Sequence, residues 1–232
     1  MSLDIIIPTL NEAENLKILL PYLNQHLPKT NSRIIVVDAA QSIDDTFQIC
    51  SLYDTTYIKS TYNQRAAQLN EGARQSNSEH ILFLHADVFP PVSFADEINS
   101  VLTKEVDFGI FAYQFNSSKL MLKFNSHLTK YDLMMSGGGD QCHFMTKSCF
   151  NTLGGYDTSY DIMEDFEFFD RVKQQKFNYK IVASKATVSA RKYDNYSWFW
   201  VNLINTNIFL RYKLGVSPNH LKRSYNKWMS RR

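Results

Sequence analysis

The sequence predicts an α/β domain built on a largely parallel sheet. Short apolar segments alternate with segments of helical spacing through residues 1–100, a pattern typical of βαβ units. Polar residues follow the ends of several apolar segments, where an open parallel sheet binds its ligands. The chain has 232 residues, 44% of them hydrophobic and 21% charged, which indicates a globular protein and excludes a disordered one.

Four strands and three helices are expected in the first hundred residues. The expected strands LDIII, RIIVVD, TYIK and HILFLHAD cover residues 3–7, 33–38, 56–59 and 80–87. The helices expected between them cover residues 11–27, 42–53 and 63–76. In the first helix, Leu16, Leu19, Leu20 and Leu23 have helical spacing, and Pro21 is expected to introduce a kink. Continuous apolar strands of this length indicate a sheet that is buried on both faces.

The pattern changes after residue 100. A strand is expected at 107–115, a helix at 119–135, and a glycine-punctuated loop with a short strand and helix at 136–157. A further helix is expected within 162–175, one or two strands within 180–190, and aromatic helices from about Tyr196. Since no repeat or low-complexity linker interrupts the chain, we expect one domain over residues 1–232. Its halves cover about 1–100 and 101–195, and its C-terminal helices about 196–232.

The cysteines and the N-terminal segment bear on location. Cys50, Cys142 and Cys149 match no metal-ligand spacing, so we expect free thiols in a reducing compartment. The N-terminal segment contains Asp4 and no long apolar run, unlike a signal peptide. No uncharged apolar run is long enough to span a membrane. A cytoplasmic location is therefore expected.

The C-terminal segment is basic. No Asp or Glu occurs from Asn195 onward, whereas seven basic residues do: Arg211, Lys213, Lys222, Arg223, Lys227, Arg231 and Arg232. Two interpretations are open. The aromatic helix packs on its own domain, or it settles at the inner face of a membrane while the basic residues contact anionic lipid. No nucleic-acid partner is expected.

Acidic side chains at two places could carry chemistry. Asp87 follows an apolar strand and could hold Mg²⁺ or Mn²⁺, while His85 beside it could line the same site or serve as a structural hydrogen-bonding group. The chain has neither GxxxxGK[ST] nor GxGxxG, so a metal is expected to neutralise a bound diphosphate. Glu164 and Asp165 begin a helix, and they could supply a general base or only complement the helix dipole. The glycines at 137–139 permit close backbone approach to a ligand, and Asp140 and Gln141 could bind hydroxyls.

Seven motifs, in order along the chain, together resemble one known family. They are IIIPTLNEAENL, IIVVDAAQSIDDT, RAAQLNEGA, LFLHAD, GGGDQCHFMTKSCFNTLGGYD, MEDFEFFDRV and LGVSPNHL. This order is similar to that of family 2 glycosyltransferases of the GT-A fold. It most resembles a small bacterial subgroup, the selenodomain-associated transferases, which carry LHAD in place of Asp-x-Asp. The resemblance covers nearly all of the chain and implies a Rossmann-like, mostly parallel central sheet flanked by helices, with further helices at the C-terminus.

The resemblance also implies an activity and the residues for it. The activity is metal-dependent, inverting transfer of a sugar from a nucleotide-diphosphate sugar, with a UDP-sugar expected, to the hydroxyl of an unidentified acceptor. Asp165 would be the catalytic base with Glu164 beside it, and Asp87 would bind the metal. The donor-binding positions would be Pro8, Thr9, Asn11, Glu12, Asp38, Arg65, Asn70, His85, Asp140, Gln141, Arg191 and Lys192. A lipid-linked acceptor is one alternative for the second substrate.

The chain departs from the family pattern at two places. The segment DAAQSIDDT is one residue longer than the usual turn and lacks its glycines, and His85 stands where relatives have the first Asp of Asp-x-Asp. Two other functions are open. A nucleotidyltransferase would usually have a glycine-rich loop with a basic residue after the first strand, which PTLNEAEN is not. A catalytically inactive carbohydrate- or nucleotide-binding protein would not need the acids of MED and HAD.

Overall fold

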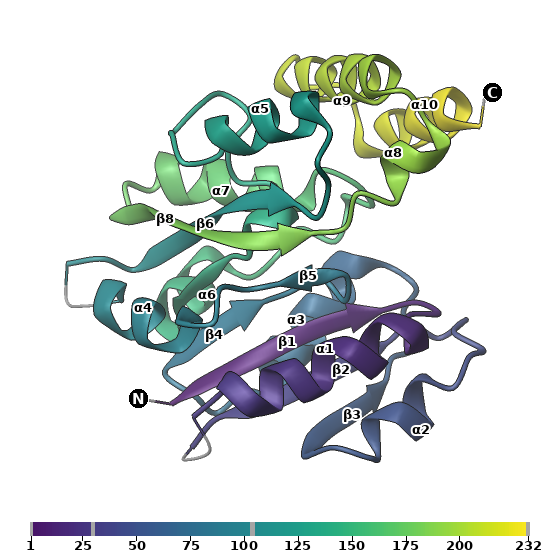
Figure 1. Ribbon diagram of the computed structural model, residues 1–232. Helices are drawn as coiled ribbons and strands as arrows, with labels where there is room; N and C mark the ends of the chain where they lie inside the picture. The colour runs from purple at the N-terminus through teal and green to yellow at the C-terminus, as the bar shows by residue number, and fades with distance from the viewer. Residues whose placement is uncertain (1, 29–30, 103–104, 231–232) are drawn as a thin grey trace.

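A single sheet organises the molecule. The computed structural model describes residues 2–28, 31–102 and 105–230, so Arg231 and Arg232 of the basic segment lie outside the described residues. Within that part of the chain, eight strands form one sheet in the order β3-β2-β1-β4-β7-β6-β8-β5. Helices cover both of its faces (Figure 1). Along β1, Ile5 and Ile7 join one apolar cluster while Ile6 joins the other, as expected of a strand buried on both sides.

The N-terminal part is parallel and alternates as predicted. Its elements are β1 (Leu3–Thr9), α1 (Ala13–His26), β2 (Arg33–Asp38), α2 (Thr46–Cys50), β3 (Thr55–Lys59), α3 (Arg65–Gln75) and β4 (His80–Phe83). Strand β1 pairs in parallel with both β2 and β4, and β2 pairs in parallel with β3. The carboxyl ends of these strands therefore meet at one edge of the sheet.

The second part completes the sheet with mixed pairing. Its elements are β5 (Val88–Phe89), α4 (Phe94–Val101), β6 (Phe108–Phe115), α5 (Leu120–Leu128), η1 (Gly139–Gln141), β7 (Phe144–Thr146), α6 (Lys147–Leu153), α7 (Glu164–Gln174), β8 (Tyr179–Val188), α8 (Lys192–Asn195), α9 (Trp198–Lys213) and α10 (Pro218–Met229). Strand β7 runs antiparallel between β4 and β6, and β6 is parallel to β8. The mixed α/β sheet confirms the predicted fold class.

Two predicted elements are shorter than expected. The strand predicted over 80–87 ends at Phe83, and a turn with a hydrogen bond from Val88 N to His85 O follows it. The helix predicted over 119–135 ends at Leu128, because the Thr129 hydroxyl accepts a hydrogen bond from Tyr113 N of β6 and holds the chain there. The first difference projects the HAD residues from the strand tip.

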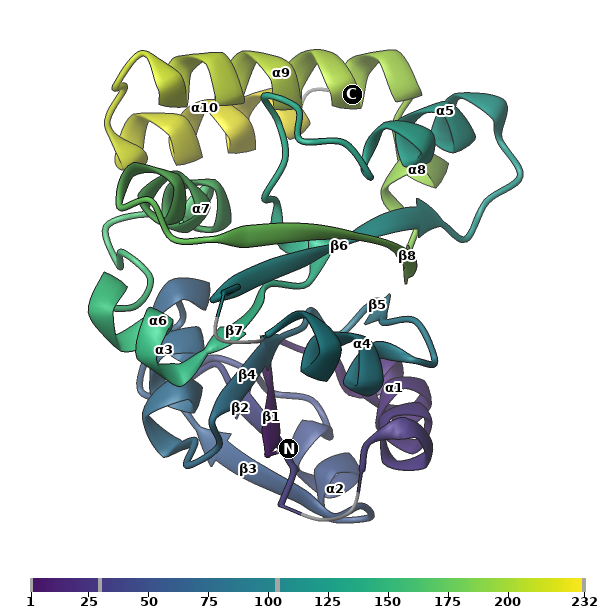
Figure 2. The same cartoon turned by 90° about the vertical axis from the view of Figure 1, so that its left-hand side faces the viewer.

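The C-terminal helices lie at one end of the molecule. Helices α9 and α10 run side by side above α7 (Figure 2), with Ile204, Ile208 and Leu221 buried between them. Over the described residues, no helix combines the length and apolar character needed to cross a membrane. The three cysteines are buried and free, as predicted.

Candidate functional site

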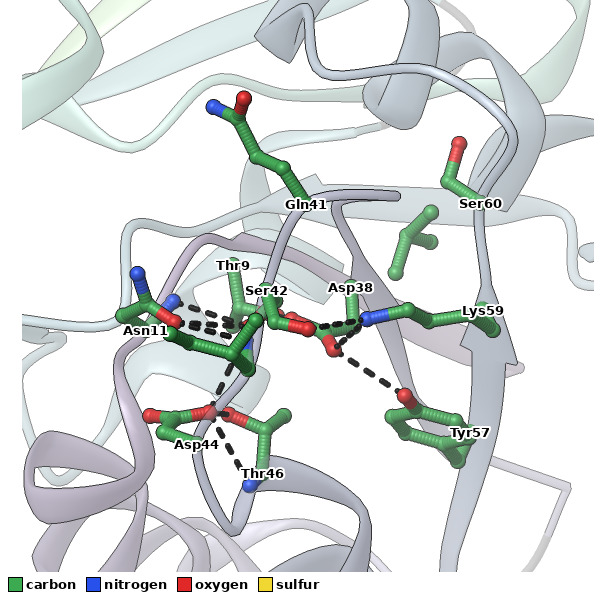
Figure 3. A network of polar contacts seen from close by, with 12 residues as sticks. Thr9, Asn11, Asp38, Gln41, Ser42, Asp44, Thr46, Tyr57, Lys59 and Ser60 are labelled. Carbon is green, nitrogen blue, oxygen red and sulfur yellow. Dashed lines mark hydrogen bonds and ion pairs between the residues drawn. The ribbon is translucent and has the colours of Figure 1, made fainter.

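A buried carboxylate lies where three parallel strands end together. Thr9, Asp38 and Lys59 are register partners across β1, β2 and β3. Asp38 Oδ1 accepts a 2.9 Å hydrogen bond from the Thr9 hydroxyl, and Asp38 Oδ2 accepts bonds of 3.0 Å from the Tyr57 hydroxyl and from Lys59 Nζ (Figure 3). The Asp38 side chain is 3% exposed and the Lys59 side chain 42% exposed, and Lys59 Nζ also donates to Ser42 O at 2.8 Å. We call the region beyond the carboxyl ends of β1 to β4 the crevice. At this end of it, Asp38 and Lys59 form a preorganised donor and acceptor pair.

The loop after β2 is fastened to the loop after β1. Asn11 has φ 55°, and its side-chain oxygen accepts a 2.9 Å hydrogen bond from Ile43 N. Asp44 accepts a 2.7 Å bond from the backbone N of Ala13 at the start of α1 and a 3.2 Å bond from the backbone N of Thr46 at the start of α2. One carboxylate thus caps both helices. The segment that lacks the family's glycines is held in place by side-chain hydrogen bonds (Figure 3).

Two buried acids begin α7 and face Arg65 at the start of α3. Arg65 Nη1 lies 3.0 Å from Glu164 Oε1 and 3.9 Å from Asp165 Oδ2. Burial raises the pKa of both carboxyls, and the Arg65 guanidinium opposes the rise. Among the described residues, Glu164 Oε1 accepts no hydrogen bond despite its nearby cation. Such acids take up protons more readily than exposed ones, as a general base requires.

Gly139 brings the loop 137–141 against the second of these acids. A Cβ at Gly139 would lie 2.5 Å from Asp165 Oδ2 and 2.5 Å from His85 Nε2. The backbone N–H of Gly139 donates a hydrogen bond to the Asp165 carboxylate, which lowers its pKa in opposition to burial. The absence of a side chain at this position therefore lets Asp165, His85 and the loop meet at one point.

The tip of β4 contributes the other charged cluster of the crevice. His85 Nδ1 lies 3.8 Å from Asp140 Oδ1. Burial, together with Arg65, lowers the pKa of His85 to about 3, so the imidazole is neutral at physiological pH. Burial, with a contribution from Asp87, raises the pKa of Asp140 to about 6. Arg191 then bridges two acids, since its Nη2 lies 3.0 Å from Asp87 Oδ2 and 3.4 Å from Glu12 Oε1.

These charged groups come from separate segments of the chain and lie at the carboxyl edge of the parallel strands. That placement is where an open α/β sheet binds its ligands. The sequence model of "Glycosyl transferase family 2" matches residues 4–149, more than half of the chain. The chain belongs to this family. It is a glycosyltransferase, and the family that the motifs predicted is confirmed.

Solved structures of glycosyltransferases share the fold of this family 2 chain. The "Mannosyltransferase PcManGT from Pyrobaculum calidifontis in complex with GDP-Man and Mn2+" is 15% identical, with a TM-score of 0.72 over 97% of this chain and 68% of that one. The structure of "S. aureus TarS 1-349 in complex with UDP-GlcNAc" is 14% identical, with a TM-score of 0.68 over 100% of this chain and 72% of that one. At these identities the likeness bears on the GT-A fold alone. The comparison with curated proteins gave no match.

A divalent metal fits the residues at the tip of β4 only as a site with few protein ligands. In the described ranges, no three His, Cys, Asp or Glu side chains gather closely enough to hold an ion by themselves. Asp87 and Asp140 are nevertheless close enough for Asp87 to raise the pKa of Asp140. Mg²⁺ is commonly held by one or two carboxylates, with phosphate oxygens and waters as its other ligands. The donor set of this glycosyltransferase is of that kind.

Four residues predicted to bind the donor have structural partners instead of an open position. The Asn70 side chain bonds to both backbone groups of Tyr156, and Lys192 Nζ donates to the Tyr225 hydroxyl at 2.8 Å. Gln141 is 3% exposed and bonds to the backbone of residues 111, 129 and 137, and Pro8 is a buried residue of β1. Their role in donor binding stays a prediction.

Sequence reasoning missed the partners that define the two ends of the crevice. Tyr57 and Lys59 hold Asp38, and Gly139 was taken only as one of three loop glycines. A signal for Lys59 was present, because a polar residue ends β3 as Asp38 ends β2. No local signal distinguished Gly139, because its neighbours Asp165 and His85 are distant in sequence.

Proposed function

We propose that this family 2 chain transfers a sugar from a nucleotide-diphosphate sugar to an acceptor hydroxyl, with metal dependence and inversion at the anomeric carbon. The observation that carries the proposal is the position of Asp165, buried at the crevice between Arg65, His85 and Gly139. A UDP-sugar is the proposed donor. The similar structures with UDP-GlcNAc and with GDP-Man and Mn²⁺ support a nucleotide-sugar and a divalent ion.

In the proposed reaction Asp165 accepts the proton of the acceptor hydroxyl. The hydroxyl oxygen then forms a bond to the sugar C1 as the bond from C1 to the diphosphate oxygen breaks on the opposite face. In-line attack of this kind inverts the configuration at C1. The bonding electrons leave with the diphosphate, whose added charge would be offset by Arg191 and by Lys192, which also donates to the Tyr225 hydroxyl.

Arg65 and Glu164 orient Asp165, the proposed base, and influence its pKa. Arg65 lies between the two carboxylates and favours their ionised forms, while burial favours their protonated forms. The balance keeps Asp165 ionised near neutral pH yet able to take a proton. A divalent ion held by Asp87 with Asp140 would supply positive charge to the diphosphate. Neutral His85 would line the same site without adding charge.

The acceptor class and the cellular location of the protein are also proposed. We propose a lipid-linked acceptor and a cytoplasmic protein that binds peripherally to the inner face of the membrane. The basic C-terminal segment supports this, because it could contact anionic lipid.

The experiment combines two substitutions with separate readouts. Asp165→Asn keeps the shape of the side chain and removes its basicity, so sugar transfer or donor hydrolysis should fall by about 100-fold or more while UDP binding by calorimetry persists. Asp87→Ala should abolish the dependence of UDP binding on Mn²⁺. Turnover of Asp165→Asn within a few-fold of wild type, or product with retained configuration, would contradict the mechanism. Metal-dependent UDP binding that survives Asp87→Ala would contradict the metal assignment.

A further inference from the structure

Helix α9 is apolar on two opposite faces. Val201, Ile204 and Ile208 form its buried face. Phe199, Leu203 and Leu210 lie within about 60° of one another at 100° per residue on the other side, and they are 73%, 61% and 44% exposed. A helix that is apolar all round is usually buried on all sides. Across the described residues, no element of this chain covers the outer face.

Helix α5 and the loop after it extend this exposed surface. Asn125 Nδ2 of α5 donates to Asn202 Oδ1 of α9 at 3.3 Å, which places the two helices side by side. Figures 1 and 2 both show them at the same end of the molecule. We call the whole surface the α5–α9 face. Its exposed apolar side chains are Leu120, Met121, Phe124, Tyr131, Leu133, Met134, Met135, Phe199, Leu203, Leu210 and Leu214.

The concentration of apolar side chains on this face is the unusual feature. Eleven of the eighteen exposed large hydrophobic residues in the described chain belong to it, although its segments are a small part of the sequence. Single exposed apolar residues are ordinary on proteins, whereas exposed apolar residues gathered on neighbouring segments point to an interaction surface.

The charge around the α5–α9 face favours a lipid surface over a second copy of the chain. Lys123 and Lys130 lie on or beside α5, as does Lys119, which is paired with Asp194 at 3.6 Å. No acid follows Asn195 in the sequence. The one acid within 117–135 is Asp132, which is paired with Lys173 at 2.7 Å. Two such faces would repel each other, whereas an anionic bilayer attracts basic residues at the rim of an apolar surface.

The α5–α9 face adjoins the proposed catalytic base. Met135 of the face is followed by the loop 137–139, in which a Cβ at Gly138 would contact Phe166 and one at Gly139 would contact Asp165. Phe166 of α7 in turn packs on Phe209 of α9, with ring centroids 5.2 Å apart. The loop 137–139 therefore links the α5–α9 face to Asp165, and α9 packs through its buried side on the helix that carries this residue.

We propose that the α5–α9 face docks on an anionic lipid bilayer and that the acceptor hydroxyl is presented to Asp165 from that bilayer. The docking is carried by apolar residues of α5, α9 and the loop 131–135, with basic residues adding electrostatic attraction. The presentation of the acceptor rests on the proposed function, whereas the choice of the α5–α9 face as the docking surface rests on its exposed residues.

Vesicle sedimentation of the full chain tests the docking. Wild type should sediment with vesicles that contain phosphatidylglycerol, more weakly with phosphatidylcholine alone, and less as salt rises. The variant Phe124→Gln/Phe199→Gln/Leu203→Gln should bind about tenfold more weakly or worse, because these exposed side chains supply apolar contact area. The control Ile18→Gln/Leu52→Gln changes residues that are 64% and 71% exposed on α1 and beyond α2, far from the face, and should bind as wild type does.

Three results would overturn the docking. They are folded wild type that stays in solution at low salt, a triple variant that sediments like wild type, and a wild-type dimer that the triple variant reduces to a monomer without any vesicle binding. UDP binding by calorimetry without vesicles separates this proposal from the proposed function. The triple variant should keep that binding unchanged. If wild type sediments but binds no nucleotide, the docking stands and the glycosyltransferase proposal fails.

Discussion

Gly139→Ala is expected to disable the proposed base without altering its chemistry. The added Cβ would lie 2.5 Å from both Asp165 Oδ2 and His85 Nε2, whereas ordinary contacts begin at 3.4 Å. One or both side chains must therefore move by roughly 0.9 Å. A displacement of about 1 Å in a catalytic group can cost about 100-fold in rate. We expect kcat to fall by about that factor.

The assay is sugar transfer or donor hydrolysis at saturating UDP-sugar, with UDP affinity and thermal unfolding measured alongside. UDP affinity should change little, because the new methyl contacts the proposed base and not the Asp38 end of the crevice. Gly154→Ala is the matched control, since no atom lies within 4 Å of its added Cβ, although its φ of 78° strains an alanine. The control should keep its kcat. A folded Gly139→Ala protein with kcat within about threefold of wild type would refute the reasoning.

Three further predictions concern the charged groups. Lys59→Met should weaken UDP binding and reduce the preference for UDP over CDP in calorimetry. Lys59 and Asp38 offer a hydrogen-bond donor beside an acceptor, which suits uracil. Cytosine presents an amino donor where uracil has a carbonyl acceptor. Equal affinity of wild type for UDP and CDP would contradict this pairing. Turnover should fall as pH decreases through the raised pKa of Asp165, because only the ionised form of this side chain accepts a proton. If turnover instead falls only near the pKa of an ordinary exposed Asp, about 3.9, the assignment of Asp165 as the base is contradicted. The raised pKa also means that the folded state binds protons more tightly than the unfolded state, so this group's contribution to stability is present at low pH and is lost as pH rises through the folded pKa. Asp165→Asn should therefore raise the melting temperature more at about pH 8 than at about pH 4, and an equal effect at both would argue against a buried ionised Asp165.

The parallel half of the fold was predictable because its signals are local. Each strand there is a short apolar run followed by a helical segment, and β1 to β4 pair as that pattern implies. The later part was less predictable, because its pairing depends on distant contacts. Strand β5 has two residues and exists only through its pairing with β8, and neither β5 nor α4 was among the predicted elements.

The candidate site shows the same division between local and distant signals. Glu164, Asp165 and Asp87 were predicted from their positions at a helix start and after a strand, and the structure brings all three to the crevice together with Arg65. The bridge from Arg191 to Glu12 joins residues 179 positions apart in the chain, so no pattern in the sequence could indicate it. Distance in sequence, and not the type of residue, limited the prediction.

That bridge suggests how donor and metal binding depend on each other. Arg191 Nη2 lies within 4 Å of both Asp87 and Glu12, so one cation offsets two carboxylates at the tip of β4. A diphosphate competes with those carboxylates for the guanidinium, because arginine pairs well with phosphate oxygens. Each carboxylate that Arg191 leaves would become available to the proposed divalent ion, whose charge would favour the diphosphate. By reciprocity, nucleotide and metal should each raise the affinity of the other.

Arg191→Gln separates the two effects. Without the guanidinium, Asp87 and Glu12 carry uncompensated charge, so Mn²⁺ alone should bind more tightly than to wild type. UDP without metal should bind more weakly, because a cation that meets the diphosphate is gone. Arg223→Gln on α10 removes the same charge from an exposed position away from the crevice and should change neither affinity. Calorimetry of Mn²⁺ and UDP, each alone and then together, measures all of these quantities. If Mn²⁺ binds Arg191→Gln no more tightly than wild type, Arg191 does not compete with the ion for Asp87, and the coupling between donor and metal must arise elsewhere.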